Sequence, residues 1–307
     1  MHMTPFFRLA RIVSLGVFTL ALAGCGGMVR LAYNNGDIAV RFAADDYFSL
    51  DAEQLDALRP QIVKFHIWHR RIELPQYAVL ANGAADRVGR GVTAPDVTWA
   101  VESVRSRYRL LAARAVDDAV PLLARLNAEN IAALEKKLAA STDKLEREYS
   151  GRDDAKRLDN RMIAVRKRVE EWLGAVTPEQ DALIADYVKT SPQVSGDRFA
   201  ERRKRQREFV AILREHRGAP EIAAKLKAYF MNPEATRSPE YEKGVQEWEQ
   251  GLARLVTGID RSASPEQRGR VVQRLARYAE DFRVLAGVGG GGAPVATSRG
   301  PGAVTAQ

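Results

Sequence analysis

The chain has 307 residues, 28% of them charged and 46% hydrophobic, and carries a formal net charge of +8. This length is enough for one large or two modest domains with a sizeable core. A single cysteine excludes an internal disulfide framework and a zinc site built from several thiolates.

The first 24 residues have the pattern of a cleaved secretory signal peptide. Arg8 and Arg11 give a positively charged start, and residues 12–23 form an apolar run that ends in small residues. Because the run is shorter than the roughly 20 residues that span a bilayer, we do not expect it to remain as a membrane helix. Export from the cytoplasm argues against a nucleic acid partner, although the basic charge alone would permit one.

The tetrapeptide Leu22-Ala23-Gly24-Cys25 resembles the lipobox of bacterial lipoproteins. The resemblance implies cleavage before Cys25, a diacylglycerol thioether on its sulfur and an acyl chain on the new amino terminus. Three chains anchor a protein almost permanently, whereas one binds only marginally. Gly26 stands where lipoproteins retained at the inner membrane usually have Asp, so the resemblance favours the periplasmic face of the outer membrane. The alternative is an ordinary signal peptide with an incidental cysteine.

Apolar residues recur at spacings of three and four through the rest of the chain, which predicts amphipathic helices and no strands. The expected fold is all-α, either a multi-helix bundle or an elongated array of amphipathic helices. Pro60, Pro75 and Pro121 fall inside helical stretches and should kink or divide them. The apolar stripes cover residues 55–72, 97–115, 131–145, 158–172, 241–259 and 271–285.

Small polar residues followed three positions later by an acidic or amide residue mark five helix starts. In such a capping box the first side chain accepts a hydrogen bond from a first-turn amide, and the later side chain returns one. Their irregular spacing argues against a solenoid of fixed period. These starts lie at residues 51–54, 93–96, 127–130, 177–180 and 264–267.

These patterns divide the chain into three parts. A signal peptide over residues 1–24 precedes a helical periplasmic domain over residues 25–286, which forms either one body or two subdomains with a boundary near residues 174–195. The glycine-rich tail over residues 287–307 has no core-forming pattern, and we expect it to be disordered.

Between about Leu22 and Ala286 the chain resembles an uncharacterised family of proteobacterial all-helical lipoproteins. The most specific matching piece is residues 68–75, Trp-His-Arg-Arg-Ile-Glu-Leu-Pro. The resemblance implies an envelope lipoprotein of helical class and carries no assigned activity. The other matching pieces are the lipobox and residues 33–37, 45–47 and 176–180.

His66, His69 and Glu73 form one candidate site. At positions i, i+3 and i+7 of a helix all three side chains can point the same way, and imidazoles with a carboxylate can hold zinc with a water in the fourth position. A metal-assisted hydrolase is therefore one hypothesis. The alternative is that His69, which lies in the apolar stripe of Phe65 and Ile72, is a core residue that hydrogen-bonds to Glu73. No HExxH sequence is present.

A basic stretch is the second candidate site. Its cations lie beside an apolar helix edge that includes Phe199 and Phe209, and such a helix can bind an anionic membrane surface. The alternative is a bundle helix with a charged outer face. The cations are Arg198, Arg202, Arg203, Lys204, Arg205 and Arg207.

No nucleophile elbow, phosphate-binding glycine loop or facing pair of carboxylates occurs in the sequence. We therefore expect a protein that is not an enzyme and has no cofactor apart from the acyl groups on Cys25. It would be a binding or structural module of the cell envelope, with the membrane and another envelope protein or lipid as partners.

Overall fold

A computed structural model describes residues 33–150, 153–191, 195–215 and 218–287. Every regular element in these ranges is helical, which confirms the all-α prediction. The signal peptide, Cys25 and all of the tail except Gly287 lie outside the described residues, so the predictions made for them are not addressed by the structure.

The described helices follow one another with short connections. They are α4 (Gly36–Phe48), α5 (Ala52–Trp68), the π-helical turn η2 (His69–Glu73), α6 (Leu74–Arg90), α7 (Ala94–Leu123), α8 (Ala128–Ser150), α9 (Asp154–Leu173), α10 (Pro178–Thr190), α11 (Ser195–Arg214), α12 (Ala219–Met231), α13 (Pro239–Ser262) and α14 (Pro265–Ala286).

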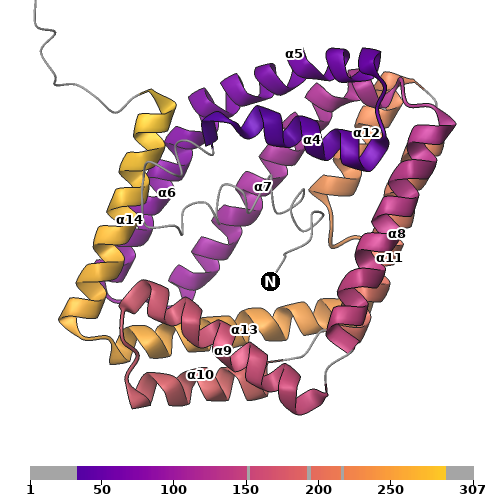
Figure 1. Cartoon of the computed structure of the whole chain (residues 1–307). Coiled ribbons are helices and arrows are strands. Elements are labelled where there is room, and N and C mark those ends of the chain that lie inside the picture. Colours follow the sequence, from indigo (N-terminus) through magenta and orange to yellow (C-terminus); the bar gives the residue numbers. More distant parts are fainter. Residues whose placement is uncertain (1–32, 151–152, 192–194, 216–217, 288–307) are drawn as a thin grey trace, which may run out of the picture.

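The helices are arranged as a four-sided frame (Figure 1). In that view α4 and α5 form the top edge, α6 and α14 the left side, and α8 and α11 the right side. The bottom edge consists of α9, α10 and α13, and α7 runs obliquely between top and bottom. The side pairs α6 with α14 and α8 with α11 are in contact along their lengths.

All five predicted capping boxes begin helices, namely α5, α7, α8, α10 and α14. At the start of α5, for example, the Gln54 amide donates to the Asp51 carboxylate at 2.8 Å, and the Asp51 amide donates to the Gln54 side chain at 3.1 Å. Because these bonds satisfy amides that no helical carbonyl can reach, each box stabilises the start of its helix.

Four of these capping residues also pair with one another across the fold. Gln54 Nε2 donates to Asn130 Oδ1 at 2.8 Å, which joins the starts of α5 and α8. Gln180 and Gln267 each donate to the other's side-chain oxygen, at 2.9 and 3.2 Å, which joins the starts of α10 and α14. The same side chains that begin the helices therefore hold pairs of helices together.

The three prolines have different effects. Pro60 and Pro121 lie inside α5 and α7, which continue through them without interruption. Pro75 is the second residue of α6, which follows η2 directly at the corner where the chain turns from the top edge into the left side (Figure 1). The expected division of a long helix is confirmed at Pro75 alone among these positions.

The described helices bury two separate apolar cores. The larger is built from α4, α5, α7, α8, α11 and α12, and its buried members include Leu134, Leu138 and Leu226. The smaller is built from α9, α10, α13 and α14 around Ile184 and Leu255. Because α11 and α12 return to the first core after α10, a boundary near residues 174–195 does not separate the two cores into successive subdomains.

The two halves of the chain repeat one arrangement. The hairpin α4–α5 packs against α7 and α8, and the hairpin α9–α10 packs in the same way against α13 and α14. The helix after each hairpin crosses to the other half, so that α6 packs along α14 and α11 packs along α8. The frame is thus an internal pseudo-two-fold repeat, in which α12 is an addition to the second half.

Short stretches of sequence also correspond, with an offset of 125 residues between α4 and α9 and of 126 residues between α5 and α10. Residues 38–41 and 163–166 both read Ile-Ala-Val-Arg, and Glu-Gln at 53–54 recurs at 179–180. The two hairpin turns both use a left-handed residue, Ser49 with φ 49° and Gly174 with φ 85°. Non-glycine residues rarely adopt such a conformation, so Ser49 marks a turn that the fold requires at this point.

Candidate functional site

The corner where α5 turns into α6 contains the most unusual local structure of the described chain. Here η2 inserts a turn with i to i+5 hydrogen bonds, and such turns are rare and frequently found at functional sites. Pro75 is the second residue of the helix that follows, a position in the first turn where the missing backbone donor of proline costs little. Residues 68–75, which carry the most specific sequence resemblance, are those that form this corner.

A buried polar cluster occupies the corner. His69 and Glu73 are only 4% and 1% exposed, at the two ends of η2. The Tyr33 hydroxyl lies 2.9 Å from His69 Nδ1, and Arg107 Nη1 from α7 lies 3.6 Å from Glu73 Oε1. Tyr77 packs edge-on against His69 with a centroid separation of 5.6 Å. The cluster therefore links the start of α4, the corner and α7.

Burial keeps most of the cluster uncharged. It lowers the pKa of His69 to about 4, so this imidazole is neutral at pH 7, and it raises the pKa of Tyr33 to about 12. With Tyr33 protonated, its hydroxyl can donate to Nδ1, which places the ring proton of His69 on Nε2. Burial also raises the pKa of Glu73, while Arg107 and a hydrogen bond with Tyr77 lower it.

The structure brings the three predicted metal ligands to one corner but does not arrange them as a metal site. Among the described residues no group of three or more His, Cys, Asp or Glu side chains could hold a metal ion. His66 packs edge-on against the Tyr33 ring, and His69 Nδ1 is engaged by the same tyrosine. The structure therefore offers no described site for the metal-assisted hydrolase. In the alternative, His69 hydrogen-bonds to Glu73; the described contacts instead pair His69 with Tyr33 and Glu73 with Arg107.

Among the described residues, two buried polar atoms of the corner have no hydrogen-bond partner, namely His66 Nε2 and Glu73 Oε2. Buried polar atoms are normally paired, and leaving one unpaired costs about 1 to 3 kcal/mol. The corner is thus a polar cluster that is not completely satisfied, in contrast to the paired capping residues elsewhere in the frame.

The start of the described chain is fixed to the same corner. Arg70 donates to the Asn34 side chain at 2.7 Å, and its guanidinium lies 5.3 Å from the centre of the Tyr33 ring. Together with the contact between Tyr33 and His69, these interactions hold the beginning of α4 beside the end of α5. Whatever precedes Tyr33 therefore joins the domain at this corner.

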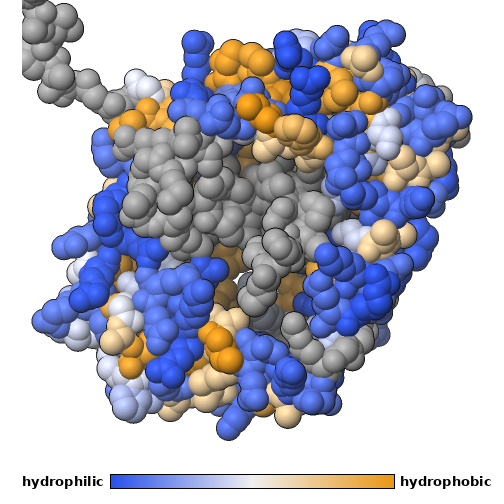
Figure 2. Space-filling model, in the orientation of Figure 1, coloured by the Kyte–Doolittle hydropathy of each residue, from blue (hydrophilic) through white to orange (hydrophobic). Residues whose placement is uncertain are grey.

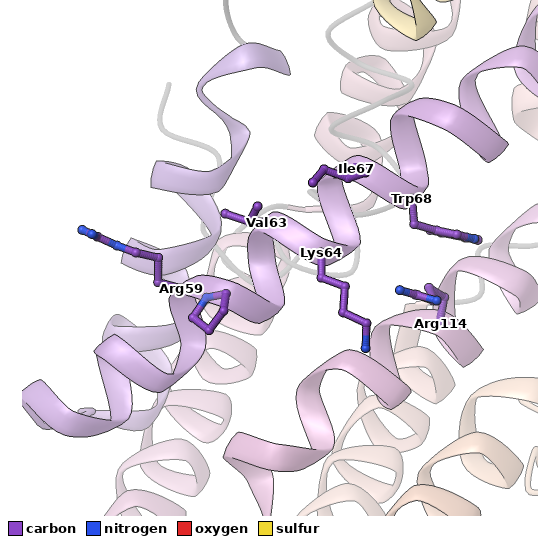
Figure 3. A pocket seen from close by; sticks show the side chains of 7 residues that line it. Arg59, Val63, Lys64, Ile67, Trp68 and Arg114 are labelled. Atoms are coloured by element: carbon purple, nitrogen blue, oxygen red, sulfur yellow. The ribbon is translucent and has the colours of Figure 1, made fainter.

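An open groove of about 580 Å³ runs along α5, beside Arg114 of α7, up to the corner (Figure 3). Its apolar wall is formed by Pro60, Val63 and Ile67, and the last two are 45% and 49% exposed. At its edge Lys64 and Arg114 both pair with the buried Asp118 of α7, at 3.0 and 2.7 Å. The remaining lining residues are Arg59 and Trp68.

Sequence reasoning missed this groove. The predicted stripe accounts for the buried Leu58 and Ile62 but does not include Val63 or Ile67. Its members are Leu55, Leu58, Ile62, Phe65, His69 and Ile72. A helix with an ordinary solvent-exposed side has polar residues outside its core face. The apolar residues outside the core face of α5 could therefore have indicated the groove from the sequence.

The basic stretch lies in α11, where most of its cations contact other parts of the chain. Arg202 and Arg203 reach α8, whereas Lys204 and Arg205 reach the end of α12 and the connection that follows it. Arg198 and Arg207 are the exposed members. The partners are Thr142 for Arg202, Asp143 and Glu146 for Arg203, the Thr236 carbonyl for Lys204, the Tyr229 and Pro233 carbonyls for Arg205, and the rings of Tyr149 and Phe199 for Arg198.

These contacts favour the bundle-helix interpretation of the basic stretch. The Arg205 guanidinium lies 4.2 Å from the centre of the Tyr229 ring, and the Tyr229 hydroxyl donates to the Arg205 carbonyl at 2.9 Å. A cation committed to such packing is not available for lipid head groups. The stretch therefore lacks the free cationic face that membrane binding through all six residues would require.

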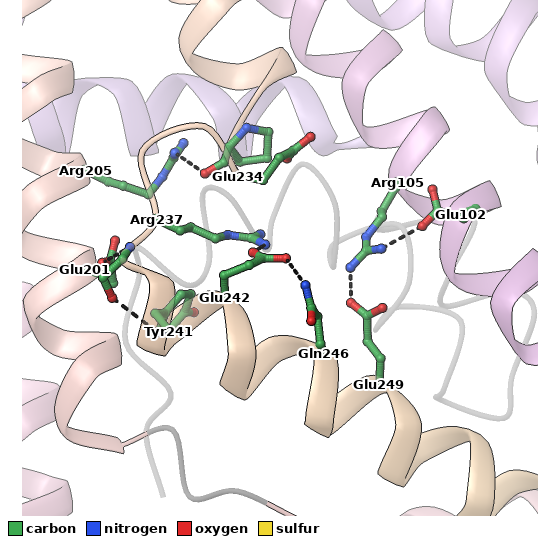
Figure 4. Close-up of polar contacts among 12 residues, drawn as sticks. Glu102, Arg105, Glu201, Arg205, Glu234, Arg237, Tyr241, Glu242, Gln246 and Glu249 are labelled. Carbon is green, nitrogen blue, oxygen red and sulfur yellow. Dashed lines mark hydrogen bonds and ion pairs between the residues drawn. The ribbon is translucent and has the colours of Figure 1, made fainter.

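Further ion pairs line α13 and α7 (Figure 4). Arg105 of α7 pairs with Glu102 on its own helix and with Glu249 of α13, while Arg237 pairs with Glu242 at 2.8 Å. These side chains are partly exposed, and exposed pairs contribute only about 0 to 1 kcal/mol each. We interpret the pair of Arg105 with Glu249 as a contact that fixes how α7 meets α13.

The class of protein that these observations define is an all-helical frame with packed, mutually paired polar groups. No helix among the described residues combines the length and apolar character needed to cross a bilayer. The chain belongs to a family of unknown function, DUF6279, whose model matches residues 46–242. Comparison with curated proteins and with solved structures finds no match.

Proposed function

We propose that this protein is a lipoprotein of the bacterial envelope, anchored through acyl chains on Cys25 to the periplasmic face of the outer membrane. The single observation that carries this proposal is the sequence Leu22-Ala23-Gly24-Cys25 after a short apolar run. Cys25 precedes Tyr33, the first described residue of the helical frame, by eight positions. The frame would thus stand directly beside its anchor.

We further propose that the frame is a binding or structural module rather than an enzyme. The contacts of the corner support this role, since Tyr33 engages His69 and Arg107 engages Glu73. Through these two contacts His69 and Glu73 help to hold α4, η2 and α7 together. The partner in this role would be another component of the envelope, a protein or a lipid.

The anchor is tested by metabolic labelling of cells with an alkyne-bearing palmitate. We expect label on the wild-type chain and none on Cys25→Ser, which should also accumulate with an uncleaved leader. Wild-type protein without label, or equal label on the variant, would overturn the anchor.

The location is tested by separating inner from outer membranes on a sucrose gradient. Gly26→Asp is the matched variant, because it keeps Cys25 and introduces the residue typical of inner-membrane retention. We expect wild-type protein in the outer membrane fraction and the variant in the inner. An acylated wild-type protein found in the inner membrane would contradict the location while leaving the anchor intact.

The module is tested by photocrosslinking in intact cells, with the photoreactive residue at exposed positions of the frame. We expect one reproducible adduct with an envelope protein or lipid. If no position gives an adduct and deletion leaves the envelope unchanged, the binding role fails.

A further inference from the structure

We propose that the edge formed by α4 and α5 lies against the membrane, with the apolar groove of α5 seated on an anionic phospholipid surface. This inference rests on the proposed anchor at Cys25 and adds the orientation of the frame and the surface that contacts lipid. It differs from membrane binding through the basic stretch of α11, which is on another side of the frame (Figure 1).

The α4–α5 edge has an unusual number of exposed apolar side chains. Phe42 on α4 is 71% exposed, and Ile38 lies one turn before it on the same face. Val63 and Ile67 on α5 are likewise exposed and line the groove. Figure 2 shows hydrophobic side chains gathered along the top of the molecule, over these two helices. Exposed apolar patches of this kind mark interaction sites.

The internal repeat shows that the frame itself does not require this apolar surface. The positions of α9 and α10 that correspond to Phe42, Pro60 and Val63 are Lys167, Asp186 and Lys189, all exposed. Ile38 corresponds to Ile163, which is also exposed, so the difference lies at the other three positions. At these three positions the α9–α10 edge has charged residues, as a solvent-exposed helix does. The α4–α5 edge has a phenylalanine, a proline and a valine there.

The charges beside the groove fit an anionic lipid surface. Arg59 lines the groove and is exposed. Within the described residues it forms no ion pair, in contrast to Lys64 and Arg114 at the groove's edge. Arginine side chains beside an apolar strip can place their stems along the apolar part and their charges among phosphates.

The anchor would hold this edge near the bilayer. Tyr33 is fixed to the corner at the end of α5, and the eight residues from Cys25 can span at most about 28 Å. The groove begins at this corner and extends along α5, which is about 25 Å long for its 17 residues. The α9–α10 edge lies at the far end of α6 (Figure 1). The lipid anchor at Cys25 would therefore hold the groove of α5 close to the membrane surface.

The test uses the full-length acylated protein in vesicles of phosphatidylcholine and phosphatidylglycerol that contain a nitroxide-labelled lipid as a fluorescence quencher. Val63→Cys carries an environment-sensitive fluorophore, and Lys189→Cys is the matched control at the corresponding position of the other edge. Cys25 is the only native cysteine, so its acylation leaves the introduced thiol as the only one to be labelled. Ile67→Cys is a second reporter in case Val63→Cys does not fold.

We expect emission at position 63 to shift to the blue and to be quenched at least about twice as strongly as at position 189, because an interfacial helix buries its apolar face roughly 5 to 10 Å deep. The difference should shrink in vesicles of phosphatidylcholine alone. Equal quenching at both positions would overturn the inference. A blue shift without quenching would also overturn it, since protein, such as a second copy, would then cover the groove. Labelling of the parent chain at Cys25 would instead show that the anchor itself is absent, and both proposals would fail.

Discussion

Replacing Gln180 by leucine should destabilise the frame more than any single surface ion pair does. Gln180 is fully buried; its oxygen accepts from the Thr177 amide and from Gln267, and its Nε2 donates to Gln267 and to the Ser262 carbonyl. Leucine is of similar size but makes none of these bonds. Each contributes about 1 kcal/mol net, and the groups left behind are buried, so we expect a loss of about 3 to 4 kcal/mol. That is a large share of the roughly 5 to 15 kcal/mol that stabilises a folded protein.

Urea unfolding monitored by circular dichroism measures this loss, and a double-mutant cycle with Gln267→Leu tests its origin. Because the two glutamines share two bonds, the double variant should be more stable than the sum of the single losses predicts, by about 1 to 2 kcal/mol. Gln246→Leu, at an exposed position of α13, is the control and should change stability by less than about 0.5 kcal/mol. A Gln180→Leu loss below about 1 kcal/mol, or strict additivity with Gln267→Leu, would refute the reasoning.

Three further predictions concern the corner, the basic stretch and the contact of α10 with α13. Burial lowers the folded pKa of His69 from 6.5 to about 4, so between these pH values the unfolded chain binds a proton that the folded chain does not. The free energy of unfolding should therefore fall by about 2 kcal/mol between pH 7 and pH 5, and by less in the variant His69→Gln. If His69→Gln has the same pH dependence as the wild type, the assignment to His69 is wrong. Arg205→Ala should lower the free energy of unfolding by about 1 to 2 kcal/mol, whereas Arg207→Ala, at an exposed position, should leave it unchanged. Equal effects of the two substitutions would show that the basic stretch is not used for packing. In Gly251→Ala the new Cβ would lie 2.7 Å from Ser191 Oγ, which is too close. The midpoint of thermal unfolding should therefore fall, although alanine has a better helix propensity than glycine. An unchanged or higher midpoint would contradict the close packing of α10 and α13 at this position.

The sequence contained most of the information about where helices begin. Capping is a local property, because the side chains at Asp51 and Gln54 reach amides only three residues away. The pairing of Gln54 with Asn130 could not be predicted in the same way, since it depends on which helices meet, and these residues are 76 positions apart. The starts of the helices could therefore be predicted from local sequence. The arrangement of the helices in a frame, and its internal repeat, depend on contacts between residues far apart in the sequence and could not.

The candidate metal site shows the same limit. The spacing of His66, His69 and Glu73 predicted that the three side chains point the same way, but this prediction assumed a regular helix. The π-helical turn over His69–Glu73 changes which way these side chains face. Tyr33 and Arg107, which engage His69 and Glu73, come from other elements, so no pattern within residues 66–73 could reveal them.

The repeat offers a way to separate what the frame needs from what the protein does. Positions that serve the frame are matched in both halves, as Leu58 is by Ile184, both buried in a core. Val63 is matched by Lys189, so at that place the fold accepts a charge, and a valine there needs another explanation. A half-exposed valine contributes little to folding, whereas an apolar side chain that enters a lipid or protein interface contributes through the area it buries. Mutations at such unmatched positions should therefore affect attachment or partner binding while leaving stability nearly unchanged, and those at matched positions should do the reverse.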